Sequence, residues 1–359
     1  MVKLRLMEQN ETIKNFIPPR AIDAISAGFN TLSKHIYLIL FPVLFDLFLW
    51  FGPKLRLKIL LEGNINSIFQ ILAPFYQDSP TNLELFAGLQ EGMSVFLDSF
   101  NLFSISSTFP VGIPSFINQT NSNSNPLGTV LNYEIQSNLQ LLLIAAILLL
   151  VGVFIGTIFF RLIVQANQSQ SSKPIQFKPI SYYFVNVLAY SITLVIAIFF
   201  ISTTTLLIAS FLSLFSMTIG QFFFLSAILI SGWFFIPAMY APISIFVLNQ
   251  NAFQSIITAY RIMGLKYRYP ISKTNAIYTM PKSIIFTLWA LVLYQGLNLV
   301  WQIPESSSWF NIFGIIGHAI ISSSIVLASF QYFQNLYHWQ EKINLNFNKL
   351  SLSIDKNDG

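Results

Sequence analysis

The fold is decided by residues 183–247, which read YFVNVLAYSITLVIAIFFISTTTLLIASFLSLFSMTIGQFFFLSAILISGWFFIPAMYAPISIFV. They belong to a run of 82 residues, between Lys178 and Arg261, that contains no Asp, Glu, Lys or Arg. As one helix this run would be about 120 Å long, roughly four times the thickness of a membrane's hydrocarbon core. The sequence therefore predicts a helical hairpin that crosses a membrane twice and turns near residues 213–220.

The composition of the whole chain supports a membrane location. Of its 359 residues, 54% are hydrophobic and 9% are charged, whereas about a quarter of the residues of a soluble domain are charged. The absence of cysteine excludes disulfides and cysteine-ligated metal sites. The net charge of +5 comes from basic residues beside the apolar runs, which indicates contact with a membrane surface and no binding of nucleic acid.

Six runs are apolar and long enough to cross a bilayer, which takes about 20 residues of helix. They are residues 35–53, 139–160, 183–209, 221–247, 283–303 and 309–333. Pro237 and Pro242 are expected to kink the fourth run near its end. The predicted fold is an all-α, polytopic integral membrane bundle of about six transmembrane helices, with a small extracytoplasmic cap and cytoplasmic amphipathic helices.

The basic residues predict the orientation of the chain in the membrane. With the N-terminus inside, 16 of the 19 Lys and Arg residues face the cytoplasm, as the positive-inside rule requires. Lys54, Arg56 and Lys58 break the rule, because they follow the first span and face outward. The first residues lack the apolar core of a signal peptide, so the first span is expected to direct insertion. We expect the plasma membrane, as in a bacterial inner membrane, with both termini cytoplasmic.

This orientation divides the chain into segments with different surroundings. Residues 1–34 form a cytoplasmic segment with an amphipathic helix, residues 35–53 the first transmembrane helix, and residues 54–138 the extracytoplasmic cap. Residues 139–333 hold transmembrane helices 2 to 6 with a basic cytoplasmic loop at 249–282, and residues 334–359 form a cytoplasmic tail.

The cap contains one clear helical pattern. Apolar residues recur at helical spacing, while three acidic residues lie seven apart on one stripe; the apolar positions are Leu85, Leu89, Met93, Phe96 and Phe100, and the acidic ones are Glu84, Glu91 and Asp98. The acidic stripe fits a solvated helix face, and its alternative interpretation is a pair of catalytic carboxylates.

Two cytoplasmic helices are expected to lie in the membrane interface. The first follows Pro18 and Pro19 and carries Ile22, Ile25, Phe29 and Leu32 on one face. The second lies within residues 249–270, carries Phe253, Ile256, Ile257, Tyr260 and Met263 on one side and is expected to end at Gly264 and Pro270. Its basic residues Arg261, Lys266 and Arg268 are candidates for binding lipid headgroups; the alternative is that they only obey the positive-inside rule.

The two tails alternate between apolar and polar residues, which predicts strands. The apolar positions are Val2, Leu4 and Leu6 in the first tail and Ile343, Leu345 and Phe347 in the last. Since both tails are predicted to be cytoplasmic, they are expected either to pair with one another or to remain unstructured.

The sequence offers little that would support catalysis. The histidines, His35, His318 and His338, lie far apart, and no nucleotide-binding loop, HExxH pattern or nucleophile elbow is present. We therefore predict no enzymatic activity, no metal and no cofactor.

Polar side chains within the spans are the remaining candidates, because ionisable groups in a membrane are costly and often functional. From the helical rise, four of them are expected in the outer leaflet; these candidate ligand-binding residues are Asp46, His318, Gln295 and Asn298. Ser202 and Thr203 to Thr205 are placed at the same level. One interpretation is a water-accessible site in which Asp46 pairs with protonated His318; the other is a set of interhelical hydrogen bonds that hold the bundle together.

The C-terminal half carries a Pro-kinked span, a short amphipathic helix from Ala252 to Ala259, a basic turn and two further spans. In these features it resembles a poorly characterised group of bacterial six-helix membrane proteins, similar to the membrane domain attached to some glycerophosphodiester phosphodiesterases. The resemblance implies a helical bundle in the inner membrane. It implies no activity, and this chain has no diesterase domain attached.

Two classes of function are compatible with the sequence. The first is a non-catalytic membrane component that organises lipids or partner proteins, as a single copy or as a homo-oligomer. The alternative is a transporter or permease for a small polar solute or a lipid, which uses the outer polar layer around Asp46 and His318. Against transport stand the lack of an internal repeat and the shortage of charge within the spans.

Overall fold

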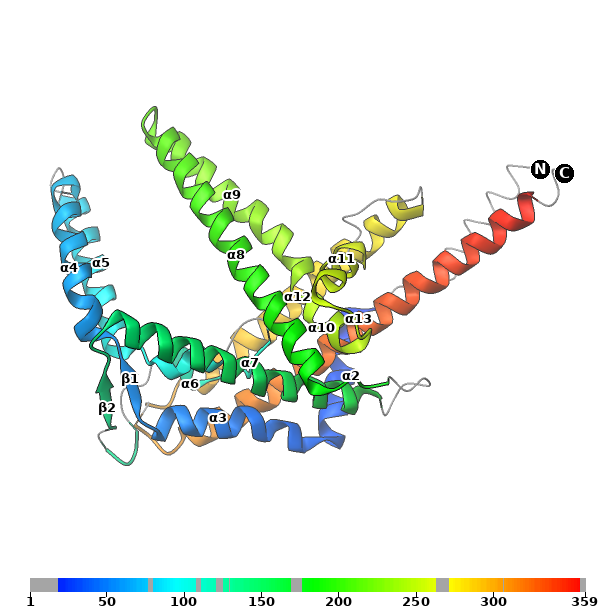
Figure 1. Cartoon of the computed structure of the whole chain (residues 1–359), viewed down its shortest axis with the longest axis horizontal. Coiled ribbons are helices and arrows are strands. Elements are labelled where there is room, and N and C mark those ends of the chain that lie inside the picture. The colour runs from blue at the N-terminus through cyan, green and yellow to red at the C-terminus, as the bar shows by residue number, and fades with distance from the viewer. Residues whose placement is uncertain are drawn as a thin grey trace. The chain divides into compact units, whose positions relative to one another are not determined.

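The computed structural model describes residues 19–76, 80–107, 111–120, 125–128, 130–168, 176–262, 271–305 and 307–355. Within them the chain is largely helical (Figure 1), which confirms the predicted all-α class. The chain packs as two compact units, one formed by residues 1–35, 160–293 and 324–359 and the other by residues 36–159 and 294–323. Each unit therefore combines segments that the sequence analysis assigned to different parts of the chain.

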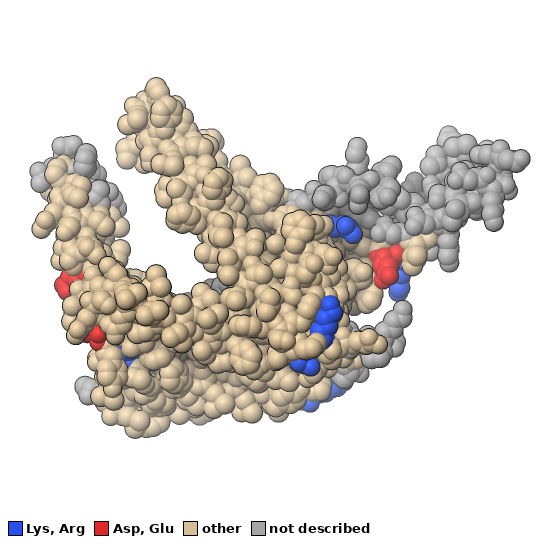
Figure 2. Space-filling model, in the orientation of Figure 1, with Lys and Arg blue, Asp and Glu red and all other residues tan. Residues whose placement is uncertain are grey.

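The first unit is built around a long helical hairpin. Helix α8 (Ile180–Ser213) and helix α9 (Met217–Ala238) run side by side (Figure 1), and the turn between them lies where the sequence predicted it. Figure 2 shows the visible face of this hairpin without charged residues. Such a surface suits lipid, because large exposed apolar patches are rare in soluble proteins.

Proline residues interrupt the helix at the end of this hairpin, as expected. Pro237 is the penultimate residue of α9, and Pro242 lies in the first turn of α10 (Ala241–Val247). The hydroxyl of Tyr190 donates a hydrogen bond to the carbonyl oxygen of Ala238 over 2.6 Å. This bond satisfies a backbone acceptor that the break leaves without its usual helical partner.

Aromatic rings fill the core of the first unit. Phe160, at the end of α7 (Asn138–Gln168), packs against Phe246 of α10 and Phe330 of α13 (Asn311–Asp355), with ring centroids 5.7 and 5.5 Å apart. Phe286 of α12 (Ile271–Trp301) stacks on Tyr332 of α13 at 4.4 Å. Helix α13 is more buried than the other candidate spans: 56% of its most apolar window is covered, against 11 to 22% for the rest.

Among the described residues, five helices are long and apolar enough to cross a membrane, and the count rises to six if a bent pair near the N-terminus is one span. The five are α7, α8, α9 with α10, the Lys282–Trp301 part of α12 and the Asn311–Lys342 part of α13. They coincide with the second to sixth predicted spans.

The first predicted span is shorter than expected. Its helical part consists of η1 (Ile36–Ile39) and α3 (Leu40–Phe51), which together rise about 24 Å, less than the roughly 30 Å hydrocarbon core. The helix that precedes it in the sequence is α2 (Ala21–Lys34), which belongs to the first unit.

Helices occur where the two amphipathic helices were predicted. Helix α2 buries Ala24, Gly28, Thr31 and Leu32, and α11 (Ala252–Ile262) buries Ser255, Thr258, Ala259 and Ile262. Most of these buried residues are small, and small residues permit close approach between helices, as in membrane bundles. The large apolar side chains Ile22 and Phe253 are exposed.

The second unit contains the segment predicted as a cap. After α3 the chain forms strand β1 (Lys54–Arg56), helix α4 (Lys58–Leu72), η2 (Ala73–Tyr76), helix α5 (Pro80–Ser99), η3 (Leu102–Ser107), helix α6 (Ile117–Thr120) and strand β2 (Asn132–Glu134). Strands β1 and β2 pair in parallel, with Leu55 opposite Tyr133. This pairing brings the start and the end of the segment together just before α7 begins.

Two apolar clusters hold this unit together. The first joins Leu49 and Trp50 of α3 to Phe116, Ile117 and Ile315. The second joins Leu57, Leu102 and Ile135 beside the two strands. Helices α4 and α5 form a hairpin in which Phe69 and Phe86 meet edge to face at 5.5 Å, and the helical pattern that begins at Glu84 in the sequence falls in α5.

Gly156 of α7 lets a loop approach the helix closely. A Cβ atom at this position would lie 2.9 Å from both the Cα atom of Gly112 and the carbonyl oxygen of Val111. Both neighbours are backbone, which cannot rotate away as the end of a side chain can. The absence of a side chain at Gly156 therefore allows α7 to contact the 111–112 loop.

The predicted strand at residues 343–347 is wrong, because α13 continues as a helix through Asp355. Extending an existing helix avoids the free-energy cost of nucleating a new one. This advantage outweighs the preference of a short alternating sequence for a strand. The first tail, Lys266, Arg268 and the predicted helix end at Gly264 and Pro270 lie outside the described residues.

We predict that Gly156→Ala destabilises the protein by about 1 to 3 kcal/mol, because the new methyl group would push the 111–112 loop away. The apparent melting temperature in detergent measures the effect. Gly296→Ala is the matched control, since nothing lies within 4 Å of a Cβ atom there. Equal melting temperatures for the two variants would contradict the close contact.

Candidate functional site

Asp46 of α3 is fully buried and accepts three hydrogen bonds from one short segment. Its Oδ1 accepts from the hydroxyl of Ser115 at 2.5 Å and from the backbone N–H of Ile117 at 3.2 Å, and its Oδ2 accepts from the N–H of Phe116 at 3.0 Å. Ser115 in turn accepts from the N–H of Asn118 at 3.1 Å. The carboxylate therefore organises residues 115–118, where α6 begins.

His318 of α13 is also fully buried, and it bonds to Asn298 of α12. The distance from His318 Nδ1 to Asn298 Oδ1 is 2.8 Å. Because an amide oxygen only accepts, the imidazole carries its proton on Nδ1. Its Nε2 is buried without a hydrogen-bond partner among the described residues, and the rings of Phe116 and Tyr294 lie 5.8 and 5.3 Å from the imidazole.

Phe116 connects these two polar groups. Its backbone N–H bonds to Asp46 and its ring packs on His318. The structure shows no direct ion pair between Asp46 and His318, and neither side chain is exposed. The expectation of a water-accessible pair is therefore wrong for this structure, because the backbone of the 115–117 segment occupies the carboxylate that the histidine was expected to meet.

The other predicted residues fall into different surroundings. Asn298 joins the cluster, while Gln295 is exposed on α12. Ser202, Thr203 and Thr204 are exposed on α8, in the other unit. Of the four candidate ligand-binding residues, Asp46, His318 and Asn298 are thus linked through Phe116 and the His318–Asn298 bond, and Gln295 is exposed.

Of the candidate headgroup-binding residues, only Arg261 lies among the described residues, and it is exposed near the end of α11. The helix is held on both sides of this position. The hydroxyl of Tyr260 donates to the carbonyl of Phe234 at 2.9 Å, and Gln340 donates to the carbonyl of Ile262 at 2.5 Å. Arg261 is thus presented to the surroundings by a fixed helix.

A second buried polar cluster was not foreseen. In the first unit, the Nε2 of Gln331 donates to Thr31 at 2.7 Å and to the side-chain oxygen of Asn167 at 2.9 Å. Asn167 donates to the carbonyl of Leu327 at 3.3 Å. The cluster links α2, α7 and α13. Thr31 and Asn167 lie near the ends of α2 and α7, and Gln331 lies within α13. Each alone looks like an ordinary polar residue, so the sequence carries no signal of the cluster.

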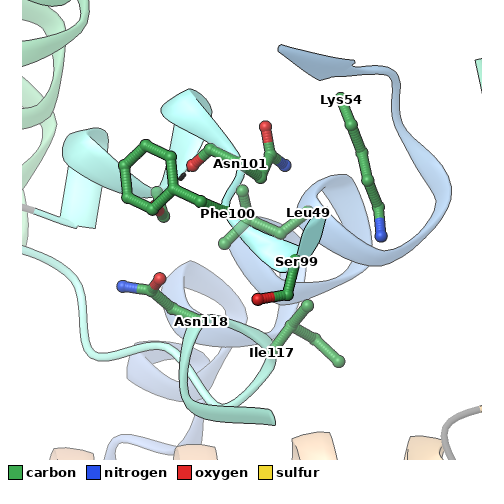
Figure 3. Close-up of a pocket in the computed structure, with 8 residues that line it drawn as sticks. Leu49, Lys54, Ser99, Phe100, Asn101, Ile117 and Asn118 are labelled. Atoms are coloured by element: carbon green, nitrogen blue, oxygen red, sulfur yellow. Dashed lines mark hydrogen bonds between the residues drawn. The ribbon is translucent and has the colours of Figure 1, made fainter. Parts of the chain in front are cut away.

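A small pocket lies in the second unit where β1 meets η3 (Figure 3). Its volume is about 30 Å³, and its walls are formed by Leu49, Lys54, Ser99, Phe100, Asn101, Ser104, Ile117 and Asn118. Lys54 is only 2% exposed. Burial, together with the nearby positive charge of Arg56, lowers the pKa of its ammonium to about 8.

The sequence did contain a signal for this pocket, namely the breach of the positive-inside rule after the first span. Each of the three basic residues makes specific contacts in the structure. Lys54 lines the pocket, Arg56 lies opposite Glu134 in the β1–β2 ladder and donates to Asn132 at 3.4 Å, and Lys58 pairs with Asp98 at 2.8 Å. The hydrogen bond to Asp98 raises the pKa of Lys58.

Among the described residues, no group of three or more His, Cys, Asp or Glu side chains is placed to hold a metal ion. Comparisons with protein-family models, with curated proteins and with solved structures found no match to this chain. The resemblance to the diesterase-linked membrane domain therefore stays a prediction.

We predict that Asp46→Asn lowers the melting temperature. The substitution turns one carboxylate oxygen into an NH₂ group that faces a backbone N–H, and leaving a buried donor unsatisfied costs about 1 to 3 kcal/mol. Thermal unfolding in detergent provides the measurement.

Ser115→Ala is the matched comparison, because it removes one of the three hydrogen bonds and keeps both backbone bonds. It is expected to cost less than Asp46→Asn. If Asp46→Asn melts like the unaltered protein, the structural role assigned to the carboxylate is refuted.

Proposed function

We propose that this protein is a non-catalytic membrane component that organises the lipids of the outer leaflet around its cap. The proposal includes a multi-pass topology in a plasma membrane, as in a bacterial inner membrane, with both termini cytoplasmic. It is supported by the five to six helices able to cross a membrane and by the distribution of Lys and Arg along the sequence. In this orientation residues 54–138 lie outside.

The observation that carries the proposal is the uncovered apolar surface of the α4–α5 hairpin. Its apolar side chains are more than a third exposed on both helices, although the hairpin lies outside the candidate spans. The exposed positions are Ile59, Ile68, Ile71, Leu83, Leu89, Met93, Val95 and Phe96. So many exposed apolar side chains on two helices are typical of contact with a membrane or another molecule.

The direction of the hairpin favours a membrane. Within the second unit, α4 and α5 run across the direction of α3 instead of continuing along it (Figure 1). If α3 crosses the bilayer, such a hairpin lies along its surface. An interfacial helix buries its apolar face about 5 to 10 Å into the boundary between headgroups and acyl chains, which is the position that the exposed leucines and isoleucines require.

The charges of the hairpin fit the same arrangement. No charged residue occurs from Gly63 to Gln77, and the described acidic residues Glu84 and Glu91 are exposed. Glu91 lies two residues after Leu89, on nearly the opposite side of α5. One side of the helix can therefore enter lipid while the other stays in water.

The alternative, a transporter that works through the outer polar layer, remains a hypothesis. It requires a solute to reach Asp46 or His318, and both are fully buried. The oxygens of Asp46 bind the 115–117 segment. Transport would therefore need this segment to leave the carboxylate in another conformation.

The hairpin's contact with lipid can be tested with spin labels, because the chain contains no cysteine. Leu89→Cys and Glu91→Cys are labelled separately in the full-length protein in lipid nanodiscs. We expect the label at 89 to be more accessible to oxygen, which concentrates in lipid, and the label at 91 to a water-soluble nickel complex.

Equal access of the nickel complex to both labels would exclude a hairpin that lies in the membrane surface. In that case the exposed stripe would be free in water or would require a protein partner.

A further inference from the structure

The longest segment of the first unit, residues 160–293, carries basic charges only. It contains eight Lys and Arg residues and no Asp or Glu, and the nearest acidic residues in the sequence are Glu134 and Glu305. The basic residues are Arg161, Lys173, Lys178, Arg261, Lys266, Arg268, Lys273 and Lys282. Any negative charge that complements them must therefore come from another part of the chain or from another molecule.

Two of these basic side chains lie over aromatic rings. The guanidinium carbon of Arg161, in α7, is 5.5 Å from the centroid of the Phe177 ring, and Lys178 Nζ is 3.8 Å from the centroid of the Tyr182 ring. The face of an aromatic ring attracts a cation, so each ring holds its cation in place. Both positive charges also act on the hydroxyl of Tyr183, which indicates that the two cations lie near one point of the unit.

Asn249 fixes the segment that carries Lys178. Its carbonyl oxygen accepts from Lys178 Nζ at 3.2 Å and from the hydroxyl of Tyr182 at 3.0 Å. Its side-chain oxygen accepts from the hydroxyl of Tyr183 at 2.5 Å, and its NH₂ group donates to the carbonyl of Gln176 at 2.8 Å. The Tyr183 hydroxyl in turn accepts from the N–H of Lys178 at 3.1 Å. These bonds hold residues 176–178 against the start of α8.

Both cations keep donors for an acceptor outside the chain. The bond to Asn249 uses one of the three N–H groups of the Lys178 ammonium, and the guanidinium of Arg161 has five. Among the described residues, the Arg161 side chain forms no hydrogen bond and neither cation forms an ion pair. Residues 169–175, which follow α7 in the sequence, include no acidic residue. Both basic side chains are half-buried, so a ligand can reach them from the surface.

In the proposed orientation both cations lie at the cytoplasmic boundary of the membrane. Arg161 directly follows the apolar run 139–160, whose 22 residues rise roughly 33 Å as a helix, close to the thickness of the hydrocarbon core. Lys178 precedes α8, the next candidate span, by two residues. The phosphates of the inner leaflet lie at this depth, and its anionic lipids attract basic residues.

We propose that Arg161 and Lys178 bind the phosphate group of an anionic phospholipid of the inner leaflet. A guanidinium fork matches two phosphate oxygens, and the ammonium supplies a second positive charge beside it. The inference goes beyond the proposed function, which concerns the outer leaflet, and it rests only on the orientation included there. Inorganic phosphate offers the same chemistry, so the test must separate the two sources.

Binding is measured by titration calorimetry on the full-length protein in a neutral maltoside detergent, which contributes no phosphate. The probes are dihexanoyl-phosphatidylglycerol, dihexanoyl-phosphatidylcholine and inorganic phosphate. We expect phosphatidylglycerol to bind the unaltered protein about tenfold more tightly than Arg161→Gln, because the substitution removes a charged hydrogen-bond donor. Phosphatidylcholine is expected to bind more weakly than phosphatidylglycerol, because its choline places a positive charge beside the phosphate.

Arg161→Gln is the main variant, because its side chain has no hydrogen bond to lose among the described residues. Lys178→Gln is expected to weaken binding in the same direction, but it also breaks the bond to Asn249. The melting temperature of each variant is therefore measured beside its affinity. An affinity of Arg161→Gln equal to that of the unaltered protein overturns the proposal.

Lys34→Gln is the matched control. It removes a positive charge from the same unit and the same predicted side of the membrane, at an exposed side chain that ends α2. It is expected to bind phosphatidylglycerol like the unaltered protein. A loss as large as that of Arg161→Gln would show a general attraction between charges and would overturn a defined site. Binding of inorganic phosphate that needs Arg161, without binding of phosphatidylglycerol, overturns the lipid as the ligand.

The outcomes separate this inference from the proposed function. If the label at Leu89 lies in lipid but binding ignores Arg161, only this inference fails. If binding needs Arg161 but the label at Leu89 lies in water, the interfacial hairpin fails and the phosphate site stands.

Discussion

The interaction on which the second unit depends is that between the Asp46 carboxylate and the donors of residues 115–117. A buried carboxylate and buried backbone N–H groups are each costly when alone, and together they satisfy one another. The bonds fix the 115–117 segment against α3. As a result the Phe116 ring reaches His318, and Ile117 joins the cluster around Leu49 and Trp50.

The cost of burying polar groups without hydrogen bonds also determines which side chains lie in the interior and which lie at the surface. Some polar side chains of the helices, such as Gln331 with Thr31 and Asn167, are turned inward and bonded to one another. Small side chains such as Gly156 allow close contacts between elements, aromatic rings fill the core of the first unit, and many other large apolar side chains are exposed. This arrangement suits a chain surrounded by lipid, where burial of apolar surface between helices gains little and hydrogen bonds and close packing hold them together.

The sequence predicted features that depend on composition and periodicity: the second to sixth spans, the turn after Ser213, and helices α2, α5 and α11. It could not predict that Asp46 would bind backbone N–H groups about 70 residues away, because every residue except proline carries such a donor. The alternating pattern at 343–347 was misleading, since helix extension from α13 is favourable there. The exception to the positive-inside rule at Lys54 to Lys58 was visible in the sequence. The contacts that these residues make could be known only from the β1–β2 pairing and the pocket.

Hydrogen–deuterium exchange at the backbone amides of Phe116 and Ile117 is the most direct measurement of the central interaction. Both amides donate to Asp46 in a buried site, so the structure predicts slow exchange in the protein in lipid nanodiscs. In Asp46→Ala the same amides lose their acceptor, and exchange should accelerate by roughly ten- to a hundredfold, the equivalent of about 1 to 3 kcal/mol. Rapid exchange in the unaltered protein, or exchange that ignores the substitution, would contradict the account.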